Sequence, residues 1–151
     1  MRRRRRKPKI TISSSQHAIR VPRKKLADLI GFVASQEGVA IAEVDLAVVG
    51  SAQVASLNRQ YLRHAGPTDV LSFDLSEGST TGLCIQLVIC GDLAVSQAGA
   101  HGLTPQRELM LYVVHGLLHH ASYADQTVRG AVRMHAREEE LLAAFEHRRK
   151  A

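Results

Sequence analysis

Two histidines four residues apart are the residues of this sequence best suited to chemistry. His115 and His119 bound the string His-Gly-Leu-Leu-His within an apolar stretch. Residues i and i+4 of a helix share a face, so two imidazoles at this spacing can bind one metal ion. Five of the eight histidines of the chain fall between His101 and His135. The spacing indicates a metal centre, and the alternative is a pair of core histidines satisfied by hydrogen bonds.

A third ligand is expected where the helix has ended. Asp125 follows His119 by six residues, and a turn there can bring its carboxylate back toward the helix face. Two imidazoles and a carboxylate are a ligand set that zinc accepts, with one position left open for water. His135 is an alternative third ligand, whereas one residue step turns His120 about 100° away from His119.

Gly116, the residue directly after the first histidine, argues against a protease. Zinc proteases of the His-x-x-x-His type carry their glutamate base directly after the first histidine, and Gly116 stands there. A glycine inside a helix costs about 1 kcal/mol relative to alanine, so it suggests close approach of another backbone or a substrate. Spacing assigns no residue of the chain as the general base.

The elements that position these residues form a small α/β pattern. Strands are expected at Lys9–Ser14, Val44–Val49, Val70–Phe73 and Leu83–Cys90, the last one covered on both faces. One helix is expected to start after Pro22 and end at Gly38, and another to start with Ser51 as its N-cap. The predicted order is β-α-β-α-β-β-α-α, with one connection long enough for a parallel crossover.

Two more helices complete the pattern. Thr104 followed by a proline is a strong helix start, and the apolar residues after it predict a central buried helix that carries the histidine pair. A last helix is expected over Val128–His147. Its residues Met134, Leu141, Leu142 and Phe145 should face inward, and Glu138–Glu140 should be mostly solvated.

The basic charge of the chain lies at its two ends. The net charge is +6, residues 2–7 carry six positive charges and residues 148–150 carry three more, which leaves −3 for residues 8–147. We expect a disordered basic arm over 1–8 and a basic tail over 148–151, flanking a single domain over 9–147. The arm can bind phosphates by counterion release, or be a solvated tail without a specific partner.

The sequence predicts neither a membrane-spanning segment nor an apolar leader. It lacks a run of about 18 uninterrupted apolar residues. The basic N-terminus is not followed by the apolar stretch of a secretory signal. We therefore expect a cytoplasmic protein without membrane contact.

Three blocks of the sequence resemble the YbeY family of bacterial endoribonucleases. They occur in the family's order and at its spacing. They are residues 57–61 with 67–73 (PTDVLSF), residues 91–93 (GDL), and residues 115–119 (HGLLH) with Tyr123 and Met134. The combination of PTDVLSF with HGLLH is far more specific than either string alone.

The resemblance implies a small mixed four-stranded sheet packed by helices and one divalent metal ion, zinc, held by the last block. The family's third histidine ligand is Asp125 here, with Ser122 and Ala124 replacing a glycine and an aspartate. The resemblance thus implies His115, His119 and Asp125 as ligands. Because the aspartate is an anion, the metal should acidify its bound water less than with three neutral imidazoles.

The resemblance also implies cleavage of single-stranded RNA in rRNA maturation and quality control of the small ribosomal subunit, with no DNA partner. The family's arginine after the tyrosine is Leu62 here, so Arg59 and Arg63 are the candidates for RNA binding. We expect a zinc-dependent endoribonuclease that hydrolyses phosphodiester bonds with a metal-activated water. The alternatives are a ribosome- or RNA-associated factor that binds without cutting, and a metal-dependent hydrolase of another substrate.

Overall fold

The N-terminal part of the chain is a β-α-β unit. The computed structural model describes residues 7–62, 70–79, 81–121, 123 and 127–150. Strand β1 (Lys9–Ser14) and strand β2 (Ile41–Val49) are parallel and are joined by helix α1 (Arg23–Glu37), which confirms the predicted crossover. Pro22 precedes α1, and Gly38 ends it in the left-handed conformation at φ 66°.

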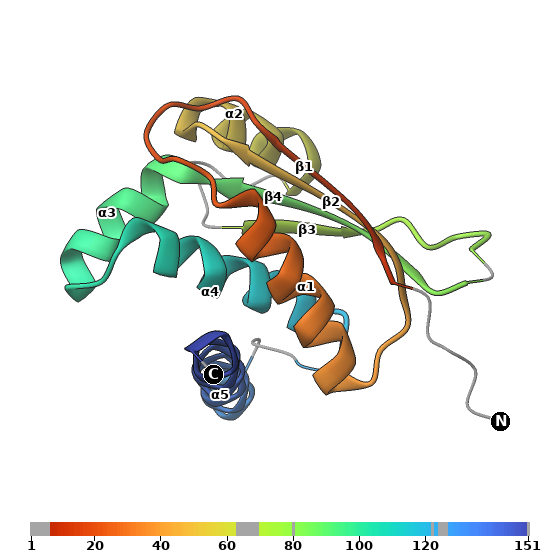
Figure 1. Ribbon diagram of the computed structural model, residues 1–151. Coiled ribbons are helices and arrows are strands. Elements are labelled where there is room, and N and C mark those ends of the chain that lie inside the picture. Colours follow the sequence, from red (N-terminus) through yellow and green to blue (C-terminus); the bar gives the residue numbers. More distant parts are fainter. Residues whose placement is uncertain (1–6, 63–69, 80, 122, 124–126, 151) are drawn as a thin grey trace, which may run out of the picture.

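A mixed sheet of four strands is the centre of the structure. Its order is β1-β2-β4-β3, where β3 is Val70–Asp74 and β4 is Leu83–Cys90 (Figure 1). Strand β4 is parallel to β2 and antiparallel to β3. The prediction of a small mixed α/β domain is therefore confirmed.

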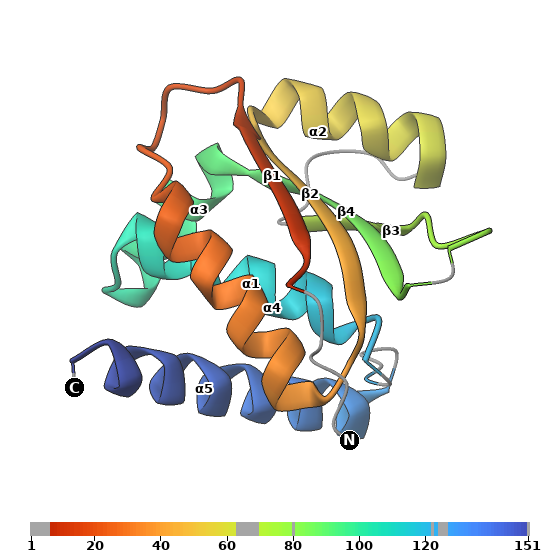
Figure 2. The same cartoon turned by 45° about the vertical axis from the view of Figure 1, so that its right-hand side comes forward.

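Strand β4 is covered on both faces, as its apolar sequence predicts. Ile85, Leu87 and Ile89 belong to the main core, which they share with buried residues of α1 and of the later helices. Val88 and Cys90 point to the other face and pack with Val54 of helix α2 (Ser51–Leu57). Figure 2 shows α2 on that side of the sheet, opposite α1 and α4. Alternation along the strand thus divides its side chains between two apolar layers.

The start of α2 differs from the expectation. Gly50 is the N-cap, not Ser51, whose backbone N–H instead donates to Asp92 Oδ2 at 2.7 Å. The carboxylate comes from a segment 41 residues away, so it replaces the local cap that the sequence suggested. A π-helical turn over Asn58–Leu62 continues α2.

Helix α3 (Gly91–His101) was not predicted. It starts directly after β4 without a side-chain cap, and its buried residues are Gly91, Ala94 and Ala98. These small residues allow close packing but produce no strong apolar stripe, so the helical period is hard to see in the sequence. The order of elements therefore has one helix more than expected.

The last two helices lie on the α1 side of the sheet. Helix α4 (Pro105–Leu118) is capped by Thr104, whose Oγ1 accepts from Arg107 N at 3.2 Å, and most of it is buried, as predicted. Helix α5 (Val128–Lys150) packs against α4 and α1 and extends three residues past the expected end at His147 (Figure 2). Among the described residues, no helix is long and apolar enough to cross a membrane.

Gly116 allows α4 to approach the sheet closely. A Cβ atom at this position would lie 2.7 Å from Leu87 Cδ2 and 3.3 Å from Val70 Cγ2. Its carbonyl accepts a hydrogen bond from Ser72 Oγ of β3 at 3.3 Å. The backbone between the two histidines therefore rests directly on β3 and β4, so the close approach that the glycine suggested involves the sheet.

The substitution Gly116→Ala should destabilise the fold despite its gain in helix propensity. Overpacking a tight core costs about 1–3 kcal/mol, whereas glycine to alanine in a helix gains about 1 kcal/mol. We expect a net loss of about 1 kcal/mol in the free energy of unfolding, measured by urea denaturation. Gly31 of α1 is the control because nothing lies within 4 Å of a Cβ there. Gly31→Ala should stabilise, and equal gains for both variants would contradict the packing explanation.

Candidate functional site

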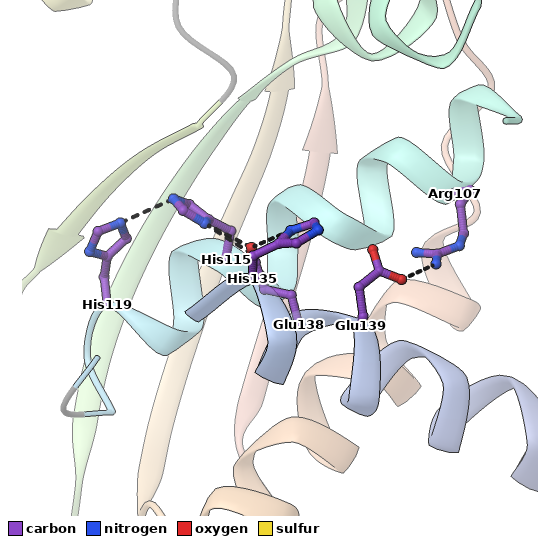
Figure 3. A network of polar contacts seen from close by, with 6 residues as sticks. All are labelled: Arg107, His115, His119, His135, Glu138 and Glu139. Atoms are coloured by element: carbon purple, nitrogen blue, oxygen red, sulfur yellow. Dashed lines mark hydrogen bonds and ion pairs between the residues drawn. The ribbon is translucent and has the colours of Figure 1, made fainter. Parts of the chain in front are cut away.

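The two histidines of the predicted pair meet at the end of α4. His115 lies in the last turn of the helix, and His119 is its C-cap residue. Their Nε2 atoms are 3.1 Å apart, and their ring centroids are 4.8 Å apart at an interplanar angle of 84° (Figure 3). His119 is exposed, and the side chain of His115 is 24% exposed. The helical spacing thus directs the same ring nitrogen of each histidine to one point at the surface.

This geometry fits the binding of one metal ion by both rings. Tetrahedral zinc with Zn–N bonds of about 2.0–2.1 Å requires its nitrogen ligands to lie about 3.3 Å apart. The observed 3.1 Å between the Nε2 atoms is close to that separation. Within the described residues no group of three His, Cys, Asp or Glu side chains converges on a metal position. Asp125, the predicted third ligand, lies outside the described residues, as do Ser122 and Ala124.

A buried carboxylate stands behind His115. Oε1 and Oε2 of Glu138, on α5, lie 3.3 Å and 3.2 Å from His115 Nδ1 (Figure 3). The side chain of Glu138 is only 6% exposed, so the expectation that it would be solvated is wrong. The position lies four residues after Met134 and four before Leu142, both of which are buried. The helical period therefore places Glu138 on the inner face of α5. Its position in a run of three glutamates led to the expectation of a solvated side chain, although its spacing from Met134 and Leu142 indicates burial.

His135, the alternative third ligand, lies next to the same carboxylate. Its Nδ1 is 3.9 Å from Glu138 Oε1, one helical turn along α5, and its side chain is 66% exposed. Figure 3 shows the contacts running in series from His119 through His115 and Glu138 to His135. His135 thus contacts the site through Glu138 and does not join His115 and His119 as a third converging group of the described chain.

A cavity of about 330 Å³ opens beside these residues, between α4 and α5. Leu111, Tyr112 and Met134 form part of its apolar wall, and His115 and Glu138 lie at its polar side. His115 therefore borders a hollow whose surface combines apolar and charged side chains.

His120 points away from the pair, as its position one step further on the helix predicts. Its Nε2 contacts Ser72 Oγ of β3. Burial lowers the pKa of His120 below its usual 6.5, and His119 adds to this effect, whereas Asp74 opposes it. The contact attaches the turn after α4 to the sheet, which is a structural role separate from the metal position.

The candidate RNA-binding arginines lie elsewhere. Arg59 is exposed on the π-helical turn that follows α2, and Arg63 lies outside the described residues. At the other end of α2, Ser51 N donates to Asp92 Oδ2 at 2.7 Å. A Cβ at Gly91, next to this aspartate, would lie 2.7 Å from Gln16 Oε1, which explains the Gly-Asp pair after β4 structurally.

Comparisons with known proteins agree on one group. A family model described as Endoribonuclease YbeY matches residues 9–146. A protein named Endoribonuclease YbeY from Moorella thermoacetica is 41% identical over 127 residues, which cover 77% of this chain and 81% of that protein. One of the same name from Nocardioides sp. is 34% identical over 146 residues, covering 91% and 97% of the two chains.

A solved structure supports the fold. The solution structure of a Thermotoga maritima protein matches with a TM-score of 0.62 and covers 93% of this chain and 91% of that chain. The two sequences are 23% identical. This similarity concerns the architecture of the chain.

The contact between His120 and Ser72 predicts a pH dependence of stability. Because the folded state lowers the pKa of His120, it favours the neutral ring. This contribution is complete above the unfolded pKa of about 6.5 and is lost as the pH falls from there toward the folded pKa. We expect the urea midpoint of the wild type to fall more between about pH 7.5 and 5.5 than that of His120→Leu. Equal decreases in both proteins would show that His120 does not contribute.

Proposed function

Because this chain belongs to the YbeY family of endoribonucleases, we propose that it is a zinc-dependent enzyme that cleaves single-stranded RNA during rRNA maturation and ribosome quality control. The observation that supports the metal dependence is the convergence of His115 Nε2 and His119 Nε2 at 3.1 Å. In this proposal the substrate is rRNA of the small ribosomal subunit, and the protein acts in the cytoplasm.

His115 and His119 would hold the ion, with Asp125 as the proposed third ligand. When bound, a divalent cation polarises a phosphate oxygen or a water and stabilises negative charge in the transition state. The two imidazoles are presented on the rigid end of α4, which rests on the sheet at Gly116. The cavity between α4 and α5 leaves room for substrate beside His115.

Attraction of RNA would come mainly from the basic arm. Residues 8–147 have a net charge of −3, whereas residues 2–7 carry six positive charges. In the proposal the arm binds phosphates nonspecifically, and Arg59 and Arg63 contribute secondary contacts.

A second candidate function is RNA binding without cleavage. Two departures from the family's pattern favour it: Asp125 in place of a histidine and Leu62 in place of an arginine. Both departures concern residues that resemblance assigns to the metal or to RNA, so a weakened active site could still leave a binding surface.

Cleavage of a single-stranded RNA should depend on both histidines. We expect His115→Ala and His119→Ala to reduce the rate by at least about 100-fold, because loss of one ligand removes the metal's contribution to the transition state. EDTA should abolish cleavage by the wild type, and added zinc should restore it. His17→Ala is the control, since His17 is exposed and precedes α1. RNA binding that survives all these changes without cleavage in any sample would support the second candidate.

The zinc content of the same variants distinguishes the third ligand. Asp125→Ala should purify with less zinc than the wild type, and His135→Ala should retain it. The opposite pattern would make His135 the third ligand, and equal content in both variants would count against Asp125.

The arm makes a separate prediction about salt. Removing residues 2–7 should weaken binding of single-stranded RNA and reduce the slope of log K against log salt by up to about 4, because each phosphate that the arm neutralises adds about 0.7 to that slope. Fluorescence anisotropy at several salt concentrations measures this slope. Thermal stability is the control, because residues 2–7 precede β1 and should not affect it. An unchanged slope would show that the arm is a solvated tail.

A further inference from the structure

We infer that Glu138 is a positioning residue for the metal centre: by accepting the Nδ1–H of His115, it directs His115 Nε2 to the metal position shared with His119. The inference rests on the proposed metal site and adds to it a residue that neither the histidine motif nor the comparisons assign. It also explains why a glutamate occupies the apolar face of α5.

The first step concerns the proton on His115. Both oxygens of Glu138 lie within 3.3 Å of Nδ1. An ionised carboxylate only accepts hydrogen bonds, so Nδ1 must be the donor. In a neutral imidazole with its proton on Nδ1, the other nitrogen carries the lone pair that a metal requires. His115 Nε2, the atom 3.1 Å from His119 Nε2, is that nitrogen.

The second step concerns burial. The side chain of Glu138 is 6% exposed, and Met134, Leu141 and Leu142 are buried beside it on the same helix. A carboxylate removed from water is costly unless it is hydrogen-bonded, and His115 Nδ1, within 3.3 Å of both oxygens, supplies that hydrogen bond. The exposed His135, at 3.9 Å, contributes less to its environment.

The third step concerns how rigidly Glu138 is held. Its two neighbours in sequence pair with other helices. Arg137 Nε lies 2.6 Å from Glu37 Oε1 at the end of α1. Glu139 Oε2 lies 3.0 Å from Arg107 Nη2 of α4, and Figure 3 shows this second pair. Three successive residues of α5 therefore contact α1 or α4, which fixes both the register of α5 and the place of the carboxylate. A supporting residue must be fixed in this way to orient a ligand.

The experiment measures zinc affinity and the protonation of the imidazole separately. Zinc is titrated against a chromophoric chelator in the wild type, Glu138→Ala, Glu138→Gln and the control Glu77→Gln, which makes the same exchange at an exposed position between β3 and β4. We expect Glu138→Ala to weaken zinc binding about 10- to 100-fold. Glu138→Gln should lose less, since its amide oxygen still accepts from Nδ1, and Glu77→Gln should bind as the wild type does.

The second readout is made on the metal-free proteins. Nitrogen-15 NMR of the imidazole rings should show the proton of His115 on Nδ1 in the wild type and a shift toward Nε2 in Glu138→Ala. A role in packing alone would change the melting temperature and leave the tautomer as it is. Because Glu138→Gln keeps the shape of the side chain, it still gives the zinc affinity if the alanine variant fails to fold, and the wild type alone still gives the tautomer of His115.

The outcomes separate this inference from the proposed function. If the wild type binds no zinc, the proposed metal dependence fails, and the NMR comparison still decides the role of Glu138. A wild-type His115 protonated on Nε2 would overturn the inference. So would an unchanged tautomer together with unchanged zinc affinity in the Glu138 variants.

Discussion

The close contact between helix α4 and the sheet at Gly116 is the constraint on which the site depends. A Cβ atom at this position would lie too close to side-chain atoms of Leu87 and Val70. Glycine, which has no Cβ, therefore allows the helix to pack this close to the sheet. Because Gly116 lies between His115 and His119, the same contact determines how far both imidazole rings lie from the sheet. His120 and Ser72 then attach the following turn to β3. A helix raised by the width of a methyl group would shift both imidazoles relative to Glu138 of α5.

Helix α5 adds a second constraint on the site, because it packs against α4 and carries Glu138 next to His115. Its inner face is apolar except at Glu138, and that exception faces His115. Exposed ion pairs contribute little to stability, so Glu139, paired with Arg107, serves mainly to specify the register of the helix. The pair of Arg137 with Glu37 is part-buried and joins α5 to α1. The buried carboxylate would be unfavourable without its imidazole partner. The fold and the site are therefore linked through one side chain, which ties the packing of α5 to the orientation of a metal ligand.

Local signals in the sequence were sufficient for the elements whose ends are determined by their own residues. Lys9–Ser14 and Leu83–Cys90 were predicted with correct bounds, and Pro22, Gly38 and Thr104 marked helix ends correctly. The prediction failed where a distant residue decides. Ser51 has a residue type typical of an N-cap, but its backbone N–H donates to Asp92, which follows β4. Helix α3 is stabilised by burial of small residues, which leaves almost no period in the sequence.

The residues of the site divide in the same way, into those that local sequence predicts and those that depend on distant parts of the chain. The pairing of His115 with His119 follows from helix geometry alone, and so does the exclusion of His120. Glu138 required knowledge of which face of α5 is buried, although its spacing from Met134 and Leu142 already contained that information. Asp125 depends on the path of a turn, which no pattern of apolar residues specifies.

The position of β4 in the middle of the sheet has a consequence for biosynthesis. Strand β4 forms a hairpin-like antiparallel pair with β3, but its parallel partner β2 was made much earlier, with α2 between them. Pairing of such distant segments is slow, because the chain loses loop entropy before the contacts form. Helix α4 rests on β3 and β4, so this part of its packing requires the sheet to have formed. The end of α4, which carries the histidine pair, should therefore reach its final position on the sheet late in folding.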